Sequence, residues 1–104
     1  MTCLLIYMTA PSAEDAQKIA ETLVTERLVA CVNMLPPMTS VYRWEGKVVS
    51  GAEVALIAKT SAAQWDAVQQ RVRELHPYDV PCLVGCDIAA GLPEFLSWII
   101  EETQ

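Results

Sequence analysis

Residues 31–47 read CVNMLPPMTSVYRWEGK, and this stretch decides how the chain can fold. It begins as an apolar strand, is interrupted at Pro36-Pro37 and ends in the turn sequence Glu45-Gly46. A double proline cannot lie inside a central ladder, because neither ring nitrogen can donate a hydrogen bond. The stretch therefore predicts one long bent strand, or two strands in tandem, leading into a β-hairpin.

Two segments on either side of this stretch have the apolar spacing of amphipathic helices. The first opens at residues 12–15, SAED, which resemble a capping box, and continues with Ile19 and Leu23 on one stripe. The second is predicted over residues 61–75 and must stop near His76, because Pro77 disfavours helical geometry in the residue before it. A short third helix is expected after Pro93.

Apolar runs predict the strands at residues 2–9, 28–35 with a continuation at 39–45, 48–60 with a bulge near Gly51, and 80–88. The order β-α-β-β-α-β plus a C-terminal helix is that of the α+β ferredoxin-like split βαβ sandwich. Two helices cover only one face of such a sheet, yet these strands are apolar on both faces. We therefore expect residues 1–104 to form a single domain that assembles with further copies of itself.

The composition supports an oligomer and excludes other partners. Hydrophobic residues make up 53% of the 104 residues, and the mean hydropathy is +0.28, which is high for so small a globule. No apolar run reaches the roughly 18 residues that a membrane span needs. The net charge of −6 would repel nucleic-acid phosphates, so neither nucleic acid nor membrane is an expected partner.

The beginning of the chain resembles a strand rather than an export signal. It carries no basic leading segment and no clear small-residue cleavage site, so we expect a cytoplasmic location with reduced thiols. Cys82 and Cys86 would share one face of a strand with Cα atoms roughly 13 Å apart, too far for a chelate or a disulfide. The sequence also has no CxxC, no HxxxH and no second histidine, so it contains no zinc-finger pattern.

Two residues remain candidate ligands, each with a structural alternative. Cys31 either fills the core or binds copper(I), which prefers thiolates and accepts two or three ligands. His76 either caps the end of a helix or lines a pocket with Tyr78, Asp79 and Cys82. His76 and Cys82 form the best local nitrogen–sulfur pair.

A second group comprises Tyr42, Trp44 and Lys59. Aromatic residues near a hairpin tip usually pack or anchor an interface, whereas Lys59 precedes a predicted helix and could bind an anion there. The chain is not expected to be an enzyme. Its single histidine has no evident nucleophile or orienting acid, and no phosphate loop or cofactor fingerprint is present.

Three motifs in order, CVN at 31–33, WEGK at 44–47 and HPY at 76–78, closely resemble those of the divalent-cation tolerance (CutA) proteins. The resemblance runs essentially end to end. It implies a tight homotrimer similar to the PII signalling proteins, and an association with tolerance of copper and other divalent cations. By position, the resemblance makes Cys31 and His76 the candidate metal ligands.

The chain departs from the family where an acidic residue often follows the proline of the VP pair, because Cys82 stands there instead. A thiol would soften a site at this position in favour of copper(I). Two hypotheses follow: a homotrimer that binds copper through Cys31, His76 and Cys82, or a PII-like sensor that holds a small anion between subunits with Lys59, Trp44 and Tyr78. A structural trimer whose partner supplies the function is a third.

Overall fold

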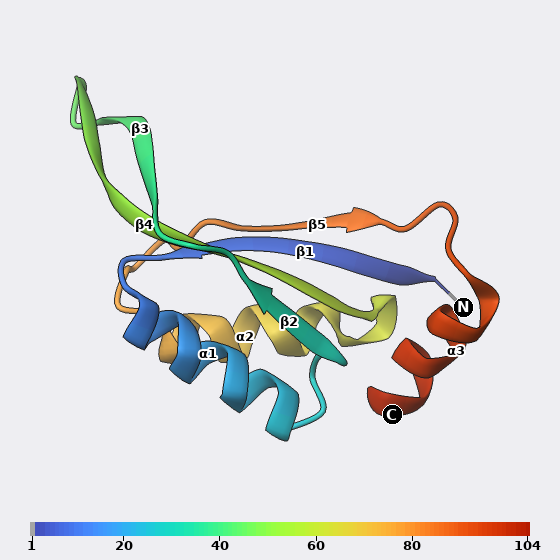
Figure 1. Cartoon of the computed structure of the whole chain (residues 1–104). Helices are drawn as coiled ribbons and strands as arrows, with labels where there is room; N and C mark the ends of the chain where they lie inside the picture. Colours follow the sequence, from blue (N-terminus) through green and yellow to red (C-terminus); the bar gives the residue numbers. More distant parts are fainter. Residues whose placement is uncertain (1) are drawn as a thin grey trace.

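The sheet at the centre of the molecule is antiparallel, as the computed structural model of residues 2–104 shows (Figure 1). Its strands are β1 (Cys3–Ala10), β2 (Cys31–Met34), β3 (Met38–Trp44), β4 (Lys47–Ser61) and β5 (Leu83–Asp87). The helices are α1 (Ala13–Thr25), α2 (Trp65–Leu75), which follows a 3-10 turn at Ala62–Gln64, and α3 (Pro93–Glu102). The body of the sheet has the order β2-β4-β1-β5, and β3 pairs with the remaining part of β4. This is the predicted ferredoxin-like order, with β2 and β3 as two strands in tandem.

The proline pair separates β2 from β3 and shifts the register of their pairing with β4. The last pair on β2 is Met34 with Leu56, and the first on β3 is Met38 with Glu53. Residues 35–37 therefore face only residues 54–55, so one extra residue lies on the proline side, as in a β-bulge. The bulge expected near Gly51 is wrong, because the pairing of β3 with β4 runs without a break through Gly51.

The hairpin of β3 and β4 closes with a tight turn at Glu45 and Gly46. Both residues lie in the left-handed region, with φ of 49° and 79°, as a two-residue turn of type I′ requires. The hairpin rises away from the body of the sheet (Figure 1) and contributes to the elongated shape of 44 × 25 × 24 Å. The predicted positive φ at Gly46 is confirmed.

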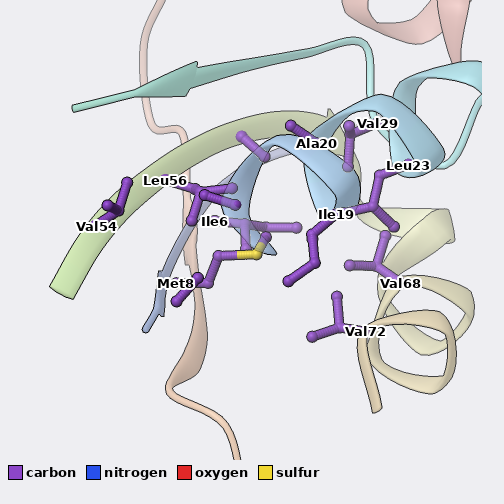
Figure 2. Close-up of a cluster of buried hydrophobic side chains, with 13 residues drawn as sticks. Ile6, Met8, Ile19, Ala20, Leu23, Val29, Val54, Leu56, Val68 and Val72 are labelled. Carbon is purple, nitrogen blue, oxygen red and sulfur yellow. The ribbon is translucent and has the colours of Figure 1, made fainter. Parts of the chain in front are cut away.

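The core lies between the sheet and the helices α1 and α2. Ile6 and Met8 of β1 and Leu56 of β4 point toward Ile19 of α1 and Val68 of α2 (Figure 2). Because strand side chains alternate, the residues between them on β1 and β4 face the opposite side of the sheet, which neither helix covers (Figure 1). A second cluster of Cys3, Ala30 and Ile99 fixes α3 at the far end, and so makes Cys3 a core residue.

Two strands are shorter than the sequence predicts. Strand β2 begins only at Cys31, because the chain leaves α1 through a left-handed residue, Arg27, with φ of 61°. The next two residues, Leu28 and Val29, then donate to the Leu23 carbonyl and not to a neighbouring strand. Strand β5 begins only at Leu83, after a prolyl segment without strand pairing. Among residues 2–104, no helix has the length and apolarity needed to span a membrane.

The capping box predicted at residues 12–15 forms in part, and it yields a first test. The Ser12 hydroxyl accepts a hydrogen bond from the Asp15 amide at 3.1 Å and donates to the Asp15 carboxylate at 2.9 Å. We expect Ser12→Ala to lower the free energy of unfolding by about 1 kcal/mol, measured by denaturant titration. Ser12→Thr keeps the hydroxyl as both donor and acceptor and should lose much less. Equal losses in both variants would show that the cap does not stabilise α1.

Candidate functional site

His76 ties the loop after α2 to the sheet. The side chain is buried, and its Nε2 lies 2.7 Å from the Thr9 carbonyl oxygen, while the Tyr78 amide donates to its Nδ1 at 3.1 Å. Since Nδ1 accepts a hydrogen bond, the proton must sit on Nε2, which donates to Thr9. Both ring nitrogens are therefore occupied by backbone groups, and the imidazole positions Tyr78 and the residues that follow.

A cleft of about 910 Å³ lies beside this loop. It is lined by side chains of three parts of the chain that the sequence does not place together, namely β1, the β3–β4 hairpin and the loop of residues 77–82. The lining residues are Tyr7, Thr9, Ser40, Tyr42, Trp44, Glu53, Pro77, Tyr78, Asp79, Val80 and Cys82. Three of the predicted site residues, Trp44, Tyr78 and Cys82, thus share one cleft, and His76 supports it from the core side.

The pKa of Tyr78 reflects the charges and the burial in the cleft. Burial raises the pKa of the Tyr78 phenol, and the neighbouring Glu53 carboxylate and the Tyr42 hydroxyl raise that pKa further. A phenolate is thus disfavoured at this position. Tyr78 consequently remains a neutral aromatic ring and a hydrogen-bond donor at neutral pH.

Cys31 and Lys59 lie elsewhere, at the β2 edge of the same sheet face. They are directly paired across β2 and β4, and the Lys59 ammonium donates to the Asn33 side-chain oxygen at 2.9 Å. Lys59 does not line the cleft that Trp44 and Tyr78 share. Within one chain, therefore, the three residues predicted to bind an anion are not brought together.

The predicted metal ligands are likewise dispersed in the single chain. Across residues 2–104, no group of three or more His, Cys, Asp or Glu side chains is placed to hold a metal ion. Cys31, His76 and Cys82 therefore do not form one centre within this chain. The thiols themselves are available, since Cys31 is half-buried and Cys82 is exposed, and both are free.

Outside the loop of residues 77–82, sequence reasoning missed four residues of the cleft: Tyr7, Thr9, Ser40 and Glu53. A signal existed for the β1 residues, because strand alternation puts Tyr7 and Thr9 on the face opposite the core residues Ile6 and Met8. No sequence signal brings Glu53 to Tyr78, since that approach depends on the bend of the hairpin.

Comparison with known proteins gives a consistent result over nearly the whole chain. Residues 4–102 match the family model described as CutA1 divalent ion tolerance protein. A Divalent-cation tolerance protein CutA from Thermus thermophilus is 46% identical over 99 residues, which is 95% of this chain and 96% of that protein. The corresponding protein of Pyrococcus horikoshii is 42% identical and covers 97% of this chain and 98% of its own length.

Solved structures agree with the sequence matches. CutA1 from Oryza sativa superimposes with a TM-score of 0.97 at 38% identity, covering 100% of this chain and 95% of that one. The Cut A1 structure from Thermus thermophilus has a TM-score of 0.96 at 45% identity, covering 98% and 99% of the two chains.

The position of His76 gives a second test. His76→Ala removes the acceptor of the Tyr78 amide and the donor to Thr9, so we expect the Tyr78 amide to exchange with solvent at least about tenfold faster. The measurement is amide hydrogen exchange by NMR. His76→Asn keeps an acceptor near the position of Nδ1 and should retain part of the protection. Unchanged exchange in His76→Ala would mean that the imidazole does not hold the loop.

Proposed function

The chain belongs to the CutA1 divalent ion tolerance family, and from that membership we propose that it binds copper or a similar soft metal ion as a homotrimer. The structural observation that carries this proposal is that Cys31 and Cys82, like Cys86, are free thiols that reach the surface. Thiolates are the ligands that copper(I) prefers, and copper(I) is satisfied by two or three of them. The role is one of binding, without catalysis.

The thiolates, rather than the imidazole, are the donor atoms in this proposal. His76 could bind a metal only by giving up its hydrogen bond to Thr9 or the one from Tyr78. Leaving the buried Thr9 carbonyl without a partner costs about 1–3 kcal/mol, and losing the Tyr78 amide bond frees the loop. We therefore assign His76 a positioning role, although the family resemblance makes it a candidate ligand.

Assembly into a trimer is supported by the hairpin and by the metal chemistry. Val41 and Val48, on the hairpin face opposite Trp44, are each more than two-thirds exposed, which is unfavourable for an isolated chain. Three copies would also supply three of each thiol, whereas one chain gathers no metal-binding group among residues 2–104. A cytoplasmic location, where thiols stay reduced, belongs to the same proposal.

Copper(I) titration tests the proposal. We expect reduced protein to compete with a chromogenic copper(I) chelator, and Cys82→Ser or Cys31→Ser to weaken its affinity about tenfold or more, because a serine hydroxyl is a poor ligand for a soft ion. Cys86→Ser, which removes an exposed thiol outside the proposed set, is the matched control. Native mass spectrometry of the same samples reports the trimer and its copper content. Equal affinities in wild type and both variants would refute the thiol assignment.

A PII-like sensor that binds a small anion between subunits is the second candidate function. The cleft that Trp44 and Tyr78 share has room for a small ligand, but its own charged lining residues, Glu53 and Asp79, are acidic, so an anion there needs a cation from outside the cleft. Lys59 lies outside this cleft within the chain, so in this candidate it must approach the cleft of a neighbouring subunit.

Thermal-shift measurements with phosphate, citrate and adenosine triphosphate test this candidate. An anion held by Lys59 should raise the midpoint of unfolding of the wild type, and Lys59→Ala should abolish that rise. Lys47→Ala, at the hairpin tip, removes an equal charge and should leave it unchanged. If no anion stabilises the wild type, or if Lys59→Ala responds equally, the sensor candidate is wrong.

A further inference from the structure

We propose that the cleft between the β3–β4 hairpin, β1 and the loop of residues 77–82 binds a small organic cation with an alkylammonium head. This goes beyond metal tolerance, because it concerns a different ligand class and needs no thiol. The lining of the cleft is acidic and aromatic, and it is held by anchored parts of the fold.

The charged residues that line the cleft are all acidic. Glu53 enters from the hairpin and Asp79 from the loop, and none of the described lining residues is a lysine or an arginine. Two carboxylates without a compensating cation create a negative potential, which attracts a cation and repels an anion. The raised pKa of Tyr78, in which Glu53 is the largest contribution after burial, reflects the same negative potential.

The remaining lining is unusually aromatic for this chain. All three of its tyrosines, Tyr7, Tyr42 and Tyr78, face the cleft together with Trp44. The faces of such rings carry negative potential and attract ammonium groups, most strongly when several rings surround one cation. Methylated or alkylated ammonium ions suit these rings because their charge is spread over apolar surface.

The lining comes from anchored parts of the fold. Tyr7 lies within β1, paired with both neighbouring strands, and Tyr42 and Glu53 lie in the paired hairpin. The loop is tied at Tyr78, whose amide donates to the buried His76, which in turn donates to β1. A cleft formed in this way needs little rearrangement to bind a small molecule.

The size and chemistry of the cleft favour an organic cation over a bare metal ion. A cleft of about 910 Å³ is far larger than a metal ion. Aromatic rings do not replace the oxygen, nitrogen or sulfur ligands that metals need. Within residues 2–104, Asp79 and Cys82 join no group of three metal-ligating side chains.

Calorimetric titration with choline tests the proposal. Its neutral isostere 3,3-dimethylbutan-1-ol has the same shape without the charge, so we expect choline to bind and the alcohol to bind at least about tenfold more weakly. Glu53→Gln and Trp44→Leu should each weaken choline binding about threefold to thirtyfold, the range of a single carboxylate or cation–π contact. Glu45→Gln removes a carboxylate at the hairpin turn, outside the lining, and should bind choline as the wild type does.

Other outcomes overturn the proposal. Equal binding of choline and the alcohol would show an apolar cleft, and absence of choline binding would show no cation site. Choline binding that survives both Glu53→Gln and Trp44→Leu would place the cation elsewhere. Size-exclusion chromatography of each variant reports its assembly. If Trp44→Leu no longer assembles and Glu53→Gln still binds choline normally, the cleft is a subunit contact and not a cation site. None of these outcomes depends on copper(I) affinity.

Discussion

The backbone constraint at Pro36-Pro37 determines the shape on which the rest of this structure depends. Two consecutive residues without amide hydrogens cannot continue the ladder that β2 forms with β4. The chain therefore places residues 35–37 opposite residues 54–55, and β3 resumes in a register shifted by one. A bulge of this kind bends and twists its strand. The hairpin consequently leaves the body of the sheet, and its aromatic side chains reach the cleft rather than the β2 edge.

The buried imidazole of His76 is the second feature on which the structure depends, because it holds the loop after α2. It lies where α2 has ended and the chain has not yet entered β5, so its loop has no strand pairing of its own. In place of that pairing, one ring nitrogen donates to the Thr9 carbonyl and the other accepts a hydrogen bond from the Tyr78 amide. A histidine suits this task because one nitrogen can donate while the other accepts, which no charged side chain can do. The same property leaves its ring without a free lone pair for a metal.

The two proposed ligands use different chemistry in different places. Soft-metal binding needs thiolates, and Cys31 and Cys82 lie on β2 and beside the cleft respectively. Organic-cation binding needs aromatic faces and carboxylates, which converge between the hairpin and the loop. Only Cys82 takes part in both surroundings.

Local patterns in the sequence were sufficient to predict the elements, their order and the family. The helical spacing of α1 and α2, the Glu45-Gly46 turn and the proline break depend on residues close in the chain, where backbone sterics and apolar periodicity act directly. These local patterns did not predict the strand register. The bulge predicted near Gly51 was wrong, because the register of a strand pair depends on both strands at once. The cleft could not be predicted either, since Tyr7, Glu53 and Tyr78 line it together only where β1, the hairpin and the loop of residues 77–82 come together. Sequence by itself determined which elements form, whereas the tertiary structure decided which side chains share a site, because that depends on packing between segments far apart in the chain.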